Sequence, residues 1–183
     1  DVMQCPYCHG YEVRDRAVGV IAVTPASATH HAQLVRQWAA DLTLFVNDVD
    51  VPAEERERLA ARGIKVVDGK VARVVADGDR IRGVELAGGG TVARDALFVG
   101  GDWEPQDALL RSLGCEVADG WVRVDGMGRT SVPGVSAAGN VVDQKATVIG
   151  AAAQGAMAAI GMNGDLVEED VERAARERRV HGM

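Results

Sequence analysis

Two cysteines near the start of the chain are the residues best suited to chemistry. Cys5 and Cys8 are separated by proline and tyrosine, and His9 follows directly. At this spacing two sulfurs can meet across one turn of the chain, and the pKa of one thiol can fall. His9 is near enough to act as acid or base for a thiol. We therefore predict a redox site formed by Cys5, Cys8 and His9, with Glu12 either orienting His9 or lying on the surface.

The two cysteines also allow three other interpretations: a zinc site, a glutaredoxin-like site and a packing role. Zinc needs four ligands, and beyond the pair the chain offers only Cys115 and four histidines without paired spacing, so no metal site is predicted. Glutaredoxins share the Cys-Pro-Tyr-Cys tetrad but continue it as a helix, which Gly10 and the charged stretch 12–16 break here. Alternatively, the two cysteines are packing residues without a redox role, and His9 is a turn residue without a catalytic role. Cys115 is expected to be a packing residue.

The composition of the 183-residue chain limits its partners. Hydrophobic residues make up 47%, charged residues 26% and aromatic residues 4%, and the formal net charge is -7. This charge argues against nucleic acid and membrane surfaces, so small molecules and proteins remain as partners. Three cysteines do not make a disulfide framework, and no signal peptide is seen, so a cytoplasmic location is expected. Because residue 1 is aspartate, we expect the sequence to begin inside a longer polypeptide.

The first hundred residues predict an α/β domain. Apolar runs of strand length alternate with helical patterns, which favours a parallel sheet with covered faces. The expected elements are strands over 18–23, 42–46 and 64–67 and helices over 27–40 and 53–62. Three further runs, 70–76, 80–86 and 91–99, are separated only by short turns, as in an antiparallel meander. The predicted fold class is α/β, a Rossmann-like three-layer parallel sheet with an inserted antiparallel β-meander.

The pattern changes after residue 100. The expected elements are a helix over 105–113, strands over 121–124 and 133–140, and helices over 147–163 and 165–179. The strand that ends at residue 140 consists of small residues. The first long helix carries Gly150, Gly155 and Gly161, which permit the close approach of a neighbour or ligand. The last helix is charged and expected to be solvated.

The turn after the first predicted strand lacks the residues of a dinucleotide site. A G-x-G-x-x-G/A fingerprint lets the backbone reach a pyrophosphate at a helix N-terminus. Val23, Pro25 and Ala28 occupy its three positions, so a side chain blocks the turn and one N–H donor is missing. The second strand leads to Asp48 without arginines for a 2′-phosphate, and Asp48 either binds a ribose or is a loop residue. The sequence therefore argues against NADPH as a cofactor.

Together these features resemble the low-molecular-weight thioredoxin reductase family of FAD- and NAD(P)-dependent pyridine nucleotide-disulfide oxidoreductases. The resemblance rests on Cys-Pro-Tyr-Cys-His-Gly-Tyr-Glu from Cys5 onward, the α/β unit with its meander, and Ser-Val-Pro-Gly-Val-Ser-Ala-Ala-Gly-Asn over 131–140. It spans nearly the whole chain. The histidine after the second cysteine is similar, more narrowly, to that of the dithiol oxidases of the gliotoxin and holomycin type.

The resemblance implies two domains. Residues 1–115 would be an NAD(P)-binding-like domain carrying the C-x-x-C, and residues 116–183 would be the C-terminal portion of a split FAD-binding domain. By this resemblance, the family's first FAD half would precede Asp1 and lie outside this sequence. We therefore expect FAD to bind the full-length parent and to bind this chain weakly or not at all. A homodimer is also expected.

The resemblance also assigns residues to the flavin. Gly139 and Asn140 would hold the ribityl and pyrophosphate region of FAD, with asparagine in place of the usual aspartate. Thr147 and Val148 would touch the isoalloxazine ring. The asparagine can still donate or accept a hydrogen bond to a hydroxyl group.

The first functional hypothesis is a flavin-dependent thiol-disulfide oxidoreductase. By resemblance, Cys8 would face the flavin, Cys5 would exchange with a small-molecule or protein dithiol or disulfide, and His9 would be the acid/base. Because the fingerprint is lost, an oxidase that passes electrons to oxygen is favoured over an NADPH-dependent thioredoxin or disulfide reductase, which is the alternative. A degenerate, non-catalytic binding or assembly module is the hypothesis of another class.

Overall fold

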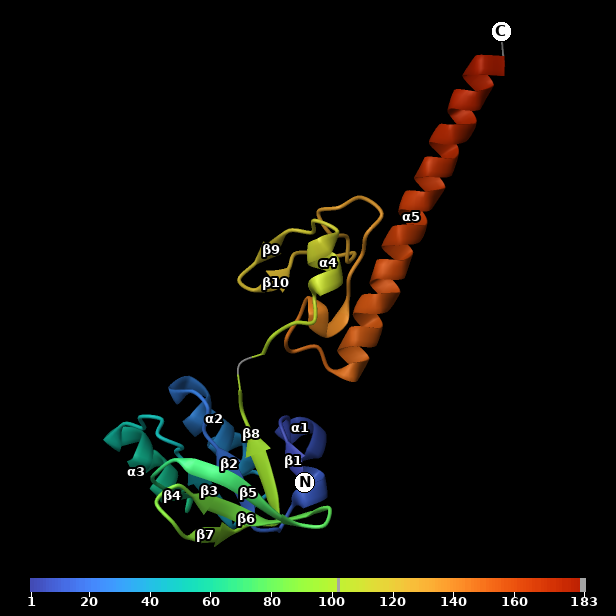
Figure 1. The fold of residues 1–183 in the computed structure, drawn as a ribbon. Helices are drawn as coiled ribbons and strands as arrows, with labels where there is room; N and C mark the ends of the chain where they lie inside the picture. Colours follow the sequence, from blue (N-terminus) through green and yellow to red (C-terminus); the bar gives the residue numbers. More distant parts are fainter. Residues whose placement is uncertain (102, 182–183) are drawn as a thin grey trace. The chain divides into compact units, whose positions relative to one another are not determined.

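The computed structural model describes residues 1–101 and 103–181, which belong to two compact units (Figure 1). Unit 1 is Asp1–Asp102 and unit 2 is Trp103–Met183. The boundary between the units lies after Asp102, whereas the sequence predicted it after residue 115. The difference arises because the segment around Cys115 bonds within unit 2. The Cys115 thiol lies 3.5 Å from Thr130 Oγ1, and the N–H of Glu116 donates to Ser131 Oγ. The assignment of the two parts to nucleotide and FAD binding stays a prediction.

Unit 1 is built on a five-stranded parallel sheet in the order β1-β8-β2-β3-β4. Its strands are β1 (Val2–Met3), β8 (Ala96–Val99), β2 (Val18–Ile21), β3 (Leu42–Phe45) and β4 (Lys65–Val67). All residues of β2 and β3 are buried, as the continuous apolar runs predict for strands covered on both faces. The expected strands in this part of the chain are thereby confirmed.

Side chains alternate between the two faces of this sheet. Val20, Leu44 and Phe98 pack in one cluster with residues of helices α2 (Pro25–Val35) and α3 (Ala53–Ala61). Ile21 and Phe45 pack in a second cluster with residues of the meander. Helices, parallel sheet and meander therefore form three layers, and the predicted fold class is confirmed.

The meander consists of β5 (Val71–Asp77), β6 (Arg80–Leu86) and β7 (Thr91–Ala93). The expected single strand over 91–99 is wrong, because the chain leaves the meander after β7 and continues as β8 between β1 and β2 in the parallel sheet. Arg94 is buried at this crossing and bonds to Thr43 Oγ1 on β3. The N–H of Asp95 donates to the carbonyl of Ala17 at the start of β2. These long-range bonds determine where the run divides.

Unit 2 contains less regular structure than the sequence suggests. It comprises α4 (Ala108–Ser112), the hairpin β9 (Val117–Ala118) and β10 (Trp121–Val122), a 3-10 turn at Gly139–Val141, and α5 (Val148–His181). The expected strand over 133–140 is wrong. Among the described residues, only an isolated bridge between Arg129 and Ser136 occurs there. The reason is a tight turn in which Gly134 has a φ of 76° and the N–H of Val135 donates to the carbonyl of Val132.

A single helix of 34 residues, α5, replaces the two helices expected over 147–163 and 165–179. Arg129 braces the region of the expected break, because its Nε and Nη2 donate to the two oxygens of Asp165 at 2.7 and 2.8 Å. Gly161 permits close packing as predicted, since a Cβ there would lie 2.9 Å from Met127 Cβ, whereas Gly155 faces open space. None of the helices within the described part of the chain combines the length and apolarity needed to cross a bilayer.

Replacement of Gly19 by alanine should destabilise unit 1. A Cβ at this position would lie 2.6 Å from Leu97 Cδ2 and 2.8 Å from Phe45 Cε2, both on fully buried side chains. Overpacking of this kind costs about 1–3 kcal/mol. Hydrogen exchange of β2 and β3 measures the stability of this unit separately. The matched control is Gly88→Ala, where no atom lies within 4 Å, and equal protection in the two variants would contradict the expectation.

Candidate functional site

A single helical turn brings the two predicted cysteines together. β1 leads into Cys5, which precedes α1 (Pro6–His9), and Pro6 occupies the start of the helix, where a missing N–H costs nothing. The N–H groups of Cys8 and His9 both donate to the carbonyl of Cys5, at 3.2 and 3.1 Å. The two Sγ atoms therefore lie 2.8 Å apart as free thiols. A disulfide requires about 2.05 Å, which a small rotation of the side chains provides.

The two thiols differ in environment. Cys5 is half-buried and Cys8 is exposed. The Cys8 thiol donates a hydrogen bond to Cys5 Sγ, and this bond raises the pKa of Cys8, with smaller contributions from burial and from charge on Cys5. The Cys8 thiol is therefore harder to deprotonate than an isolated thiol.

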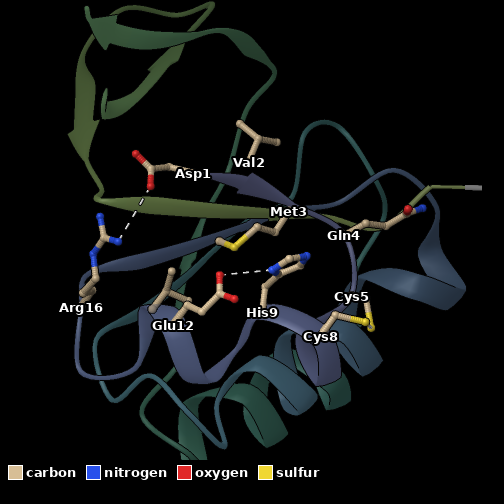
Figure 2. Close-up of a pocket in the computed structure, with 10 residues that line it drawn as sticks. Asp1, Val2, Met3, Gln4, Cys5, Cys8, His9, Glu12 and Arg16 are labelled. Atoms are coloured by element: carbon tan, nitrogen blue, oxygen red, sulfur yellow. Dashed lines mark hydrogen bonds and ion pairs between the residues drawn. The ribbon is translucent and has the colours of Figure 1, made fainter. Parts of the chain in front are cut away.

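His9 and Glu12 lie beside the thiols, at the edge of an open cleft. His9 Nδ1 is 3.2 Å from Glu12 Oε2, so the carboxylate that the sequence offered as a partner does contact the imidazole. Figure 2 shows both side chains with the thiols along the cleft, which has a volume of about 520 Å³. Asp1 and Arg16 line the cleft as well, and Arg16 Nη1 lies 3.8 Å from Asp1 Oδ1. The cleft thus combines two thiols, a histidine and charged side chains of both signs.

The aromatic side chain of Trp38 fixes the helical turn that carries the thiols. Its ring meets the ring of Tyr7 edge-on at 5.9 Å. A Cβ on Gly10 would lie 2.6 Å from the Trp38 ring and 2.5 Å from the carbonyl of Pro6. Only glycine fits at this position, and it ends α1 directly after His9. The predicted end of the helix at Gly10 is confirmed, whereas nothing in the sequence pattern pointed to Trp38.

The carboxyl end of the parallel sheet does not fit a pyridine dinucleotide. Val23 is 44% exposed in the turn after β2, and α2 begins with Pro25, which has no N–H to offer. The sequence predicted this loss of phosphate contacts. Two residues after β3, Asn47 and Asp48, adopt left-handed φ angles of 50° and 62°.

Asn47 uses its side chain to join three segments at this edge. Its Nδ2 donates to the carbonyl of Ala22 after β2, and its Oδ1 accepts from the N–H of Val71 in β5. The adjacent Asp48 adds negative charge where a 2′-phosphate would need a cation. These residues fit a closed, self-bonded edge and not a site for NADPH.

In unit 2 the residues assigned to the flavin pyrophosphate bond to their own loop. Gly139 has a φ of 79°, which favours glycine, and its N–H donates to Gln154 Oε1 on α5 at 2.8 Å. Asn140 Nδ2 donates to the carbonyls of Asp143, Gln144 and Ala146, at 3.1 to 3.3 Å. Asn140 therefore shapes the loop that leads into α5. Its contact with a cofactor stays a prediction.

Thr147 and Val148 stand at the start of α5 and are exposed. Val148 is 91% exposed and Ile149 is 81% exposed, which is unusual for large apolar side chains. The first N–H groups of a helix lack acceptors within the helix. Thr147 Oγ1 accepts one of them, from Gly150 at 3.4 Å. Exposed apolar side chains at a helix start are compatible with a flat ring that has polar edges, and their contact with FAD stays a prediction. Gly139, Asn140, Thr147 and Val148 all lie within one loop and helix start.

Neither metal binding nor a role for Cys115 emerges from the geometry. In the part of the chain that the structure describes, no three histidine, cysteine or acidic side chains form a group able to hold a metal ion. Cys115 is 7% exposed, which agrees with the predicted packing role.

The comparison with protein families places the chain. Residues 19–156 match the family described as pyridine nucleotide-disulphide oxidoreductase. The match covers well over half of the chain. The chain therefore belongs to the pyridine nucleotide-disulphide oxidoreductase family.

Solved structures and a curated relative refine this placement. HlmI is 47% identical with a TM-score of 0.92, covering 100% of this chain and 57% of HlmI. TrxB of Bacillus anthracis, assigned to the thioredoxin reductases, is 28% identical with a TM-score of 0.82, covering 92% of this chain and 57% of TrxB. A monodehydroascorbate reductase of Arabidopsis thaliana is 35% identical over 81 residues, 43% of this chain and 16% of that enzyme. The chain thus spans little more than half of HlmI and TrxB, and the predicted thioredoxin reductase-like relationship is confirmed.

Removal of the Cys5 sulfur should lower the pKa of Cys8. In Cys5→Ala the acceptor of the Cys8 proton is lost, so the Cys8 thiolate should form at lower pH than in the unmodified protein. The measurement is the pH midpoint of iodoacetamide alkylation at Cys8, read by peptide mass spectrometry. Buried Cys115 serves as an internal control that reacts only after unfolding. A midpoint that stays in place or moves to higher pH would show that the 2.8 Å contact does not control Cys8.

Proposed function

We propose that the protein is a flavin-dependent oxidase of dithiols, in which Cys5 and Cys8 carry the exchange with substrate. The observation that supports this most is the pair of free sulfurs 2.8 Å apart beside an open cleft. Membership of a disulphide oxidoreductase family supports the same class of reaction. FAD in the whole protein would supply a two-electron acceptor that restores the disulfide and passes the electrons to oxygen.

The exchange begins with the pair in its disulfide form. A substrate thiolate attacks Cys5 Sγ, the Cys5–Cys8 bond breaks, and Cys8 leaves as a thiolate. The second substrate thiolate then attacks the substrate sulfur of the mixed disulfide and releases Cys5. The substrate loses two electrons and two protons and becomes a disulfide, and the cysteine pair gains both as a dithiol. The oxidation is therefore balanced within the pair.

His9 moves the protons of this exchange. Its imidazole would accept the proton of the incoming substrate thiol and deliver a proton to the departing Cys8 thiolate. The contact between Nδ1 and Glu12 Oε2, at 3.2 Å, holds the ring and leaves Nε2 for the thiols. The assignment of Cys5 to the substrate and Cys8 to the flavin follows the family resemblance, although Cys8 is the more exposed of the two in unit 1.

The sheet edge that does not fit NADPH supports oxygen as the electron acceptor. Val23, Pro25, Asn47 and Asp48 offer neither the backbone donors nor the cation that a phosphorylated dinucleotide needs. Oxygen as acceptor needs no second nucleotide site. The substrate in this proposal is a small-molecule or protein dithiol, and the protein acts as a cytoplasmic homodimer.

Stopped-flow reduction of the flavin tests the proposal. In the FAD-loaded full-length protein without oxygen, excess dithiothreitol should bleach the flavin absorbance, and NADPH should do so far more slowly. Cys5→Ser and Cys8→Ser should each abolish bleaching by the dithiol, whereas Cys115→Ala, in a packing position, should leave it intact.

Two outcomes would contradict it. Rapid bleaching by NADPH would favour an NADPH-dependent disulfide reductase, the second candidate, which the family membership supports. Unchanged cellular activity of the Cys5→Ser/Cys8→Ser double variant would favour a non-catalytic binding module.

A further inference from the structure

A buried histidine lies under the segment that delivers Cys5. His31 is on α2 and only 9% exposed, and its ring meets the ring of Phe98 edge-on at 5.9 Å. Phe98 in β8 stands opposite Met3 in β1, one residue before Gln4 and two before Cys5. His31 therefore packs where β1 and β8 end, on the side of the sheet that α2 covers.

The backbone on both sides of His31 is closely fitted to its ring. A Cβ on Gly100, directly after β8, would lie 2.5 Å from His31 Nδ1, so only glycine fits there. The backbone of Gln4 also acts on the imidazole, since it raises the pKa of His31 against the larger effect of burial. The imidazole thus fills the space between the chain that enters the dithiol turn and the chain that leaves β8.

The surroundings disfavour a positive charge on this imidazole. Among the described residues, His31 Nε2 is buried without a hydrogen-bond partner. Burial lowers the pKa of His31, with a smaller effect from neighbouring His30, and the backbone of Gln4 opposes the shift. Phe98 and Gly100 carry no charge. Cys5, beyond Gln4, is either a neutral thiol or a negatively charged thiolate. A proton on His31 would therefore need the segment to open to water.

We propose that His31 is a positioning residue for the dithiol: its neutral imidazole fixes Gln4 and the start of the Cys5–Cys8 turn, and its protonation releases that segment. This role goes beyond the proposed oxidase activity, since it concerns the geometry of the thiol pair whatever its electron acceptor. It makes the order of the redox turn sensitive to acid.

The direction of the pH effect follows from proton linkage. The opened segment binds a proton on His31 with an ordinary pKa of about 6.5, and the closed segment binds it less tightly. Opening is therefore independent of pH above about 7. It increases as the pH falls below about 6.5, by up to about tenfold for each pH unit.

Hydrogen exchange of the segment from Gln4 to His9 tests this inference. Rates are divided by the intrinsic rates at each pH. The unmodified protein should lose protection about tenfold between pH 7.5 and pH 5.5, and His31→Phe, which keeps an aromatic ring without a titrating group, should not. If His31→Phe does not fold, His31→Gln makes the same comparison.

Two control variants separate His31 from the other histidines. His30→Gln removes the exposed neighbour, and His9→Gln removes the histidine within the segment; both should keep the loss of protection in acid. The inference is overturned by equal protection of the unmodified protein at both pH values. The inference is also overturned if the pH response persists in the His31 variants, or if it is absent in His9→Gln. Hydrogen exchange does not require turnover, so it tests the role of His31 separately. Failure of the oxidase proposal would instead be seen in the flavin-bleaching experiment.

Discussion

The pairing of β8 with two partners at once is the contact on which the rest of unit 1 depends. β8 bonds in parallel to β2 on one side and to β1 on the other. β1 has two residues and, among the residues that the structure describes, pairs with no strand other than β8, so its formation depends on β8. Cys5 follows β1 directly, and the position of the redox turn is thereby set by a strand more than ninety residues further along the chain.

The thiol pair therefore combines local and long-range causes. One helical turn with Pro6 at its start brings the sulfurs together, and this can be predicted from the spacing of Cys5 and Cys8 alone. Besides β8, Trp38 helps to fix where the turn lies on the domain, since it follows α2 and packs against Gly10. A sequence pattern contains the first cause and not the second, because packing across the sheet leaves no periodic signal.

The same distinction explains which elements were predictable. β2, β3 and α3 are continuous patterns bounded by turns, and their bounds fall within a few residues of expectation. The run over 91–99 is equally continuous, yet it divides at Arg94 because the guanidinium is buried against β3. In unit 2, a break was expected between the helices over 147–163 and 165–179, but Arg129 bonds across that region and α5 continues. Asn140 carries no local sign that its amide serves its own loop.

Asn47 has a consequence for how the domain is stabilised. In a nucleotide-binding domain a ligand contributes stability in proportion to its concentration relative to its dissociation constant. Here the hydrogen bonds that join the ends of β2 and β5 come from an amide of the chain itself. The stability of this sheet edge therefore does not depend on the concentration of a nucleotide. It is the same in a cell rich in reduced nucleotides and in one that has exhausted them.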